Sequence, residues 1–237
     1  MLNYSTYVSS IANLMPVSTT DVGFQTMLPN MIDDAEQRLY REIDFLDTVV
    51  RDYSSTFTTG TRTFGLPSSI GTFFVVNSIY AITPAGTSIP DNGTRNALTP
   101  VSRDFLDFTF PSSAASSVPA YFAMTTQTTC IVAPWPDQAY QAEVVGTIRP
   151  QPISSTNSTT ILSVYFPDLL VAASMVFAAG YMQNFGQQAD NPQMAQSWEN
   201  HLQLLLKSAA VEEARKKFTS QGWSSKQPAD LATPPRT

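Results

Sequence analysis

The hydrophobic pattern of this chain changes period twice, and this constrains the fold more than any other feature. Near both ends, apolar residues recur every three or four positions, as on one face of a helix. These residues are Leu28, Ile32, Ala35, Leu39 and Ile43 in the first part, and Met194, Trp198, Leu202, Leu205 and Ala209 in the last. Between them the period is two, as in β-strands. We therefore expect an α+β fold, in which N- and C-terminal helices form a bundle and an antiparallel β domain is inserted.

Start and stop signals place the helices. Tyr4–Met15 ends at Pro16, and a second helix covers Asp21–Ile43 with an interruption near Pro29. Asn191-Pro192 is typical of a helix start, and that helix should end near Phe218. The predicted domains are 1–46 with 164–218 for the bundle, 47–163 for the β domain and 219–237 for an extended C-terminal arm.

Charged side chains on these helices are spaced to form ion pairs one turn apart. The expected pairs are Asp34 with Arg38, Glu212 with Lys216 and Glu213 with Lys217. Solvated helix faces explain these charges without a functional site.

Alternation in the middle of the chain predicts the strands. Val49–Phe57 and Arg62–Leu66 flank Thr59-Gly60 and are expected to pair as a hairpin. Phe73–Thr83 is rich in β-branched and aromatic residues, and a second hairpin should turn near Gln127. Arg103–Phe108 is expected to be a short helical or irregular link.

The segment after Pro167-Asp168 is apolar nearly all round, so its helix must be covered on most sides. Ala172, Ala173, Ala179 and Gly180 would let another backbone approach closely. The helix could therefore lie at the centre of one subunit or against a neighbouring chain, and we mark these four residues as a candidate subunit interface.

Charge excludes some functions. The formal net charge is −6, the pI is about 4.6 and charged residues make up only 14% of the chain. This argues against a sequence-reading nucleic-acid binder, which normally needs a basic face, but it allows DNA to slide past without adhering. No signal peptide or apolar run long enough for a membrane span is apparent, so we expect a soluble protein without a membrane anchor.

Catalytic residues are scarce. His201 is the single histidine and Cys130 the single cysteine, so zinc sites and Cys/His nucleophile pairs are nearly excluded. Glycine-rich phosphate loops and nucleophile-elbow motifs are absent from the sequence. We expect no enzyme, no metal and no cofactor.

Two segments carry a resemblance to a known family. Asp34-Ala35-Glu36-Gln37-Arg38-Leu39-Tyr40-Arg41-Glu42-Ile43-Asp44 precedes the predicted hairpin and the Leu66-Pro67 step. Phe166-Pro167-Asp168-Leu169-Leu170 opens the small-residue helix, and a helix bearing Trp198 follows it. In this order the chain resembles the head–tail adaptor (connector) proteins of short-tailed bacteriophages, although 84–119 has no clear counterpart.

The resemblance implies a structural virion protein at the neck of the particle, assembled in the host cytoplasm. Family members form a ring, usually twelvefold, between the portal protein and the tail nozzle protein, and genomic DNA passes through its channel at ejection. The C-terminal segment of the family docks on the portal. The corresponding candidates here are Phe218, Trp223, Lys226 and Leu231.

Other functions remain open from the sequence. A nozzle or tail-completion protein would share a ring but bind below the adaptor. A glycan-binding β module could use Tyr80, Tyr121, Trp135 and Tyr140 as stacking surfaces. A hydrolase with paired carboxylates is the least favoured alternative. The partner of Trp223 is also open, since the indole could dock on another protein or on the chain's own helices.

Overall fold

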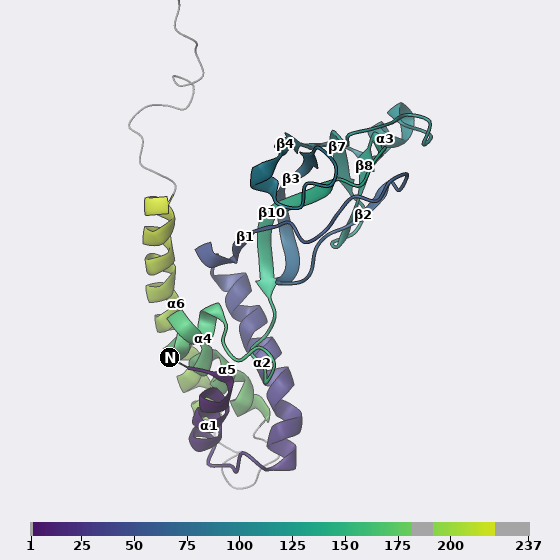
Figure 1. The fold of residues 1–237 in the computed structure, drawn as a ribbon. Coiled ribbons are helices and arrows are strands. Elements are labelled where there is room, and N and C mark those ends of the chain that lie inside the picture. Colours follow the sequence, from purple (N-terminus) through teal and green to yellow (C-terminus); the bar gives the residue numbers. More distant parts are fainter. Residues whose placement is uncertain (1, 182–191, 221–237) are drawn as a thin grey trace, which may run out of the picture. The chain divides into compact units, whose positions relative to one another are not determined.

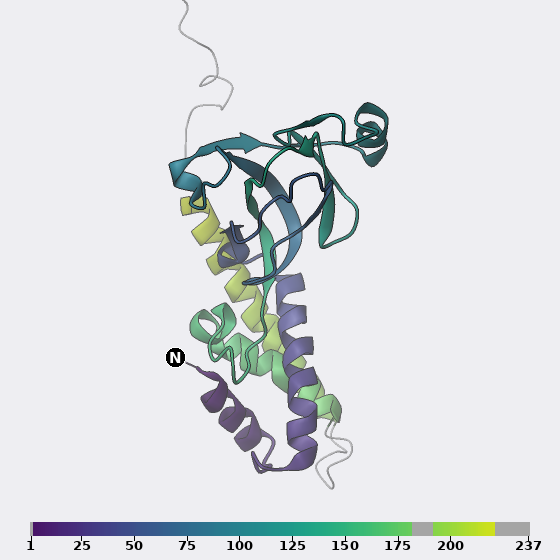
Figure 2. The ribbon, with the colours of Figure 1, turned by 45° about the vertical axis from the view of Figure 1, so that its right-hand side comes forward.

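The computed structural model describes residues 2–181 and 192–220, and it shows an α+β protein (Figures 1 and 2). Contacts between Cα atoms divide the chain into two compact units. One unit contains Met1–Leu46 and Pro152–Thr237, and the other contains Asp47–Gln151. We describe each unit by itself.

The first unit is helical. Its elements are α1 (Tyr4–Leu14), α2 (Val22–Glu42), α4 (Ile161–Tyr165), α5 (Pro167–Tyr181) and α6 (Pro192–Ser220). Side chains that accept from free amides fix the helix starts. Asn3 and Thr6 form a capping box for α1, Asp21 caps α2 through the Phe24 amide, and Thr160 with Ser163 caps α4.

Of two sequence predictions on these helices, the interruption near Pro29 was wrong, and the end of the last helix near Phe218 is confirmed. Pro29 does not interrupt α2, which runs through it, and the exposed ring faces away from the core. The last helix continues two residues beyond Phe218 to Ser220.

The helical core is built around α5, which packs against α2 and α6 and also touches α1 (Figures 1 and 2). The all-round apolar sequence of α5 explains this central place, because each of its faces meets another element. The largest fully buried side chains of this helical core include those of Tyr7, Ile11, Phe24, Met31, Leu39 and Phe45.

The second unit is built from two main sheets. Sheet A has the order β1 (Val49–Asp52), β10 (Gln141–Pro150), β3 (Gly71–Thr83), β4 (Thr94–Ala97). Sheet B has the order β2 (Thr63–Gly65), β8 (Thr129–Ala133), β7 (Tyr121–Met124), β5 (Thr99–Pro100). The remaining elements are β6 (Ser116–Ser117), β9 (Trp135–Pro136), α3 (Arg103–Thr109) and the short 3₁₀ turns η1 (Leu46–Thr48) and η2 (Pro90–Asn92).

The predicted hairpin of Val49–Phe57 with Arg62–Leu66 was wrong. β1 pairs with β10 in sheet A, whereas β2 pairs with β8 in sheet B. Each strand alternates as predicted, but alternation does not identify the partner strand. The hairpin near Gln127 is confirmed, since β7 and β8 pair on either side of Thr125–Thr128. Most pairs are antiparallel, and β5–β7 and β6–β9 are parallel.

The pairing of β3 with β10 is the longest in the unit and contains two register shifts. Gly146 lies at the first of them. A Cβ at this position would lie 2.1 Å from the Val75 carbonyl oxygen, so a side chain would force the two strands apart.

The return from the β region joins the helical unit earlier than predicted. Residues 152–163 group with the helices, not with the β domain to which we assigned them. Ile153 is 1% exposed within the helical core, and its amide donates to Glu36 Oε1 at 3.1 Å. Among the described residues, no helix is long and apolar enough to cross a membrane.

Candidate interaction surfaces

The C-terminal end of α6 is held in place by three side chains. Glu213, 3% exposed, accepts from the Leu46 amide at 2.8 Å and from Lys216 Nζ at 2.8 Å. Lys216 Nζ also lies 4.8 Å from the centre of the Phe166 ring. Burial opposes the charge on Lys216, but its hydrogen bonds to Glu213 and Glu212 outweigh this and raise its pKa. The last turns of α6 thus have a defined position in the helical unit.

The charge pairs of α6 differ partly from those expected. Glu212 pairs with Lys216 at 2.9 Å, which confirms that prediction. Lys217 pairs with Asp44 and not with Glu213. The i,i+4 rule misses such a pair, because Asp44 follows α2 and is brought to α6 only by the fold.

A bidentate ion pair joins α2 to α6. Arg38 Nη1 and Nη2 donate to the two carboxylate oxygens of Glu199 at 2.7 and 2.5 Å. Arg38 also binds Glu42 at 2.7 Å, and not Asp34 as predicted. The hydrogen bonds to Arg38 lower the pKa of Glu199, as expected for a charge-assisted fork.

The small residues of α5 lie partly in the core of the chain itself. Ala172 and Ala173 are 1% and 0% exposed, whereas Ala179 is half-buried. Gly180 lies in α5, but its surroundings are outside what the structure describes. Ala172 and Ala173 therefore find cover without a second copy, and the subunit interface at these four residues stays a prediction.

A buried hydroxyl chain fixes α1 to α5. The Ser174 hydroxyl donates to the Leu170 carbonyl at 2.7 Å, so the Tyr7 hydroxyl, 2.7 Å away, donates to Ser174. Burial raises the pKa of Tyr7. The sequence predicted only that Tyr7 lies in the first helix and gave no sign of this partner 167 residues away.

A buried carboxyl group lies on α2. Glu36 is 2% exposed, and its Oε1 accepts from the Ile153 amide. Within the described part of the chain, Glu36 Oε2 and the nearby buried hydroxyl of Tyr40 have no hydrogen-bond partner. Burial raises the pKa of Glu36 to about 7, and repulsion from Asp33 adds to this effect. The group can therefore change charge near neutral pH.

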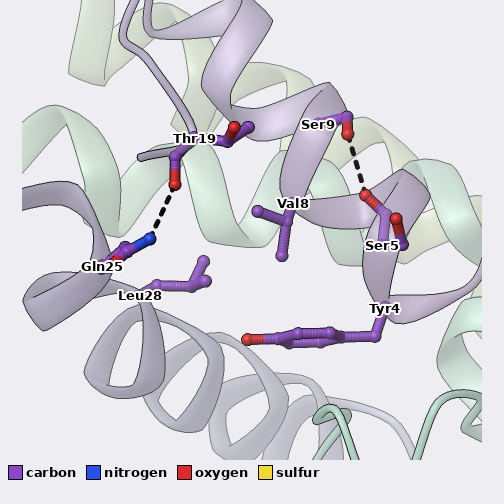
Figure 3. A pocket seen from close by; sticks show the side chains of 7 residues that line it. All are labelled: Tyr4, Ser5, Val8, Ser9, Thr19, Gln25 and Leu28. Carbon is purple, nitrogen blue, oxygen red and sulfur yellow. Dashed lines mark hydrogen bonds between the residues drawn. The ribbon is translucent and has the colours of Figure 1, made fainter. Parts of the chain in front are cut away.

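A pocket of about 450 Å³ lies between α1 and α2, and we call it the α1–α2 pocket (Figure 3). Tyr4, Val8 and Leu28 give it apolar walls that converge on the hollow (Figure 3). The other lining residues are Ser5, Ser9, Thr19 and Gln25. Their hydrogen bonds are partly made already, since Ser9 donates to the Ser5 carbonyl at 2.9 Å and Gln25 to the Thr19 carbonyl at 3.1 Å. None of the lining residues carries a charge.

In the β unit, a fully buried carboxylate ties sheet A together. Glu143 on β10 is 0% exposed and accepts from Arg51 on β1 at 2.6 Å and from Arg95 on β4 at 3.1 Å. Arg95 also binds Asp91 at 2.6 Å and lowers the pKa of that carboxyl. The sequence analysis did not identify this network, because its three strands are far apart along the chain.

The short helix α3 presents an aromatic surface. Leu106 is 0% exposed against Ala123 and Ala133, and Asp107 binds Arg62 at 2.6 Å. On the outer side, Phe105 is 43% and Phe108 is 89% exposed, and we call these two residues the α3 tip. Phe108 has the highest exposure of the large hydrophobic side chains in the described residues. The uncharged run from Phe108 to Pro136 is the sequence signal that could have found it.

The four aromatic residues proposed for glycan stacking do not form an open platform. Tyr140 is 4% exposed in the core of the β unit. The Tyr121 ring is already in contact with Phe105 and Phe110, at centroid distances of 5.8 and 6.0 Å. Tyr80 belongs to sheet A and Tyr121 to sheet B, and Trp135 lies on β9.

His201 and Cys130, the residues considered for catalysis or metal binding, lie in surroundings that suit neither role. His201 is exposed on α6 and lies edge-on to Trp198 with 6.0 Å between ring centres. Cys130 is 0% exposed, and burial raises the pKa of its thiol to about 12, which suppresses the reactive thiolate. The described residues contain no group of three or more metal-ligating side chains.

The predicted portal-docking residues cannot be placed. Phe218 lies in the last turn of α6, but its side chain is outside the description. Trp223, Lys226 and Leu231 lie beyond the described residues altogether.

Comparison with known proteins agrees with the resemblance seen in the sequence. The family described as SU10 adaptor protein matches residues 2–225, which is nearly the whole chain. No curated protein matches the chain. This family consists of structural proteins of the bacteriophage head–tail connection and is not a class of enzymes. The chain belongs to the SU10 adaptor protein family.

Proposed function

We propose that this protein forms a ring, twelvefold as in the family it resembles, between the portal protein and the tail nozzle protein in the neck of the virion. The observation that carries the proposal is the family match over residues 2–225. In this proposal the bundle of N- and C-terminal helices carries the β region as an inserted domain. Copies assemble in the host cytoplasm before they join the particle.

The charge of the chain supports a channel for DNA. Each copy carries a formal net charge of −6, and acidic groups along the bore would keep the genome from adhering during its passage. Sequence-specific contacts with DNA have no place in this proposal, since they normally need basic groups facing the duplex.

The residues after α6 are the proposed portal-docking arm. Helix α6 ends at Ser220. Its last turns are held to the helical unit by contacts of Glu213 with Leu46, Lys216 with Phe166 and Lys217 with Asp44. The following segment includes Trp223, a residue type enriched among interface hot spots. A fixed helix end would give this arm a constant starting point in every copy of the ring.

A truncation tests this docking. Deleting residues 221–237 keeps all of α6 and the contacts described for Glu213, Lys216 and Lys217, so we expect the same helical content by circular dichroism and the same melting temperature. Binding of the truncated chain to purified portal, measured by co-sedimentation, should be lost. Trp223→Ala should weaken binding by about tenfold or more, as for an aromatic hot spot, with Ser225→Ala as the matched arm control of smaller effect. Undiminished binding by the truncated chain contradicts the docking assignment.

A further inference from the structure

A buried glutamate holds the backbone at each of the two points where the chain passes between its units. The helical unit ends at Leu46, where the chain first enters the β unit, and begins again at Pro152, where the chain returns. We call these points the first and the second passage. At the first, the Leu46 amide donates to Glu213 Oε2 at 2.8 Å. At the second, the Ile153 amide donates to Glu36 Oε1 at 3.1 Å.

The two glutamates are equally buried, at 3% and 2% exposure, but their charges are balanced differently. Glu213 binds Lys216 Nζ at 2.8 Å, so its negative charge has a partner. Glu36 Oε2 has no hydrogen-bond partner among the described residues, and Arg38, two positions further along α2, is bound to Glu199. A buried carboxylate without a cation is costly, whereas the protonated, neutral form of the same group is not.

The groups around Glu36 do not compensate for a negative charge. Those that interact with Glu36 electrostatically lie on α2 and α1, and they are Asp33, Tyr40 and Tyr7. Residues 150–164, which return from the β unit, contain no titratable side chain. Asp168, the one charged side chain of α5, accepts from the Leu169 amide at 2.9 Å. Burial therefore dominates and raises the pKa of Glu36 to about 7, and repulsion from Asp33 adds to it.

We propose that Glu36 is a pH-sensitive latch on the second passage of the chain. When Glu36 loses its proton, the segment at Ile153 is released from the helical unit more often, because release lets water reach the carboxylate. Glu213 keeps the first passage in place, since Lys216 balances its charge. The helical unit then holds the chain at one passage instead of two. This inference concerns the single chain and does not depend on the proposed ring.

Amide hydrogen exchange of the free full-length chain, followed at single residues by NMR, tests the latch. The held form binds the Glu36 proton more tightly than the released form, in which the pKa is near 4.5. The released population therefore rises as pH rises from about 4.5 to 7 and is constant above that range. We expect the protection factor of Ile153 to fall by about tenfold per pH unit in this window.

Two substitutions separate the two passages. Glu36→Gln stays neutral and can still accept from the Ile153 amide, so the protection factor of Ile153 should no longer depend on pH through this group. Lys216→Met removes the cation beside Glu213, so it should lower the protection factor of Leu46 and leave the pH dependence at Ile153 unchanged. Circular dichroism at pH 4.5 checks that both variants are folded, and the wild-type profile is informative without either of them.

Local release is distinguished from unfolding of the whole helical unit by an internal reference. Met31, 0% exposed near the middle of α2, exchanges only when that unit unfolds, so Ile153 should be less protected than Met31 throughout the window. Equal protection of these two amides at every pH would overturn the latch. A fall at Ile153 that persists in Glu36→Gln would also overturn it, because another group would then be titrating. Neither result bears on the ring, since no portal is present.

Discussion

At the scale of single residues, the least expected group is the buried carboxyl of Glu36. One of its oxygens accepts from the Ile153 amide, and the other has no partner among the described residues. Burial in this position favours the protonated, neutral form and raises the pKa to about 7. Glu36 thus links α2 to the segment that returns from the β region. The contribution of this link to the free energy of unfolding depends on pH, because burial disfavours the charged form of Glu36.

This link predicts a pH-dependent stability of the helical unit. The folded state holds the Glu36 proton more tightly than the unfolded state, in which the pKa is near 4.5, so the free energy of unfolding falls as pH rises from about 4.5 to 7. We expect a loss of roughly 2–4 kcal/mol across this window. Glu36→Gln, which stays neutral, should remove this part of the pH dependence and be more stable than wild type at pH 8.

The pH dependence of the free energy of unfolding is measured by denaturant unfolding at pH 4.5, 6 and 8, followed by far-ultraviolet circular dichroism. Asp33→Asn is the matched control one turn earlier on α2, since Asp33 is exposed. Asp33→Asn should keep the fall in the free energy of unfolding with rising pH, but shift this fall to slightly lower pH, because the substitution removes a repulsive neighbour of Glu36. An unchanged pH profile for Glu36→Gln would show that Glu36 is not the titrating group.

At the scale of elements, sheet A depends on a charge that the sequence did not mark. Glu143 on β10 receives Arg51 from the neighbouring strand β1 and Arg95 from the edge strand β4, and removing one partner of a buried pair leaves the other charges uncompensated. We expect Glu143→Gln to lower the free energy of unfolding of the β unit by about 2–3 kcal/mol, near the low end for buried pairs because both arginines retain some contact with solvent.

The same network supplies a control. Asp91 binds Arg95 at 2.6 Å, but its side chain is 81% exposed, and exposed pairs contribute little. Asp91→Asn should therefore leave the unfolding midpoint in denaturant nearly unchanged. If the two substitutions had equal effects, the buried carboxylate would not be the element that holds the strands together.

The elements themselves could be predicted well where the signal is local. Pro192 begins α6 as expected, Asp21 precedes α2, and the turn between β7 and β8 lies at Gln127. These features depend on a few neighbouring residues. The partner of β1 and the partner of Arg38 depend on residues 92 and 161 positions away or more, and a local pattern carries no information about them.

The candidate surfaces show the same division. The small residues of α5 were recognised, but the sequence could not decide whether the chain itself or a neighbour covers them, and Ala172 and Ala173 lie in the chain's own core. The α1–α2 pocket and the α3 tip were missed, because concavity and exposure arise only when elements pack. Uncharged runs at residues 1–20 and 108–136 were the available hints.

At the scale of the whole molecule, membership of the SU10 adaptor protein family gives these surfaces their meaning. A head–tail adaptor must contact the phage portal and tail proteins, and in the ring proposed above it also contacts copies of itself. A chain with only 14% charged residues and long uncharged stretches can bury much surface in such contacts at a low cost of desolvation. The same composition would be less easily explained in an isolated monomer.

The most direct test of the central claim is the mass and symmetry of the particle formed when the chain is co-expressed with its portal protein. Electron microscopy with native mass spectrometry should show a twelvefold ring of this chain, coaxial with the portal and bound at one end of it. Single copies, an open filament, or a portal particle without this chain would contradict the account.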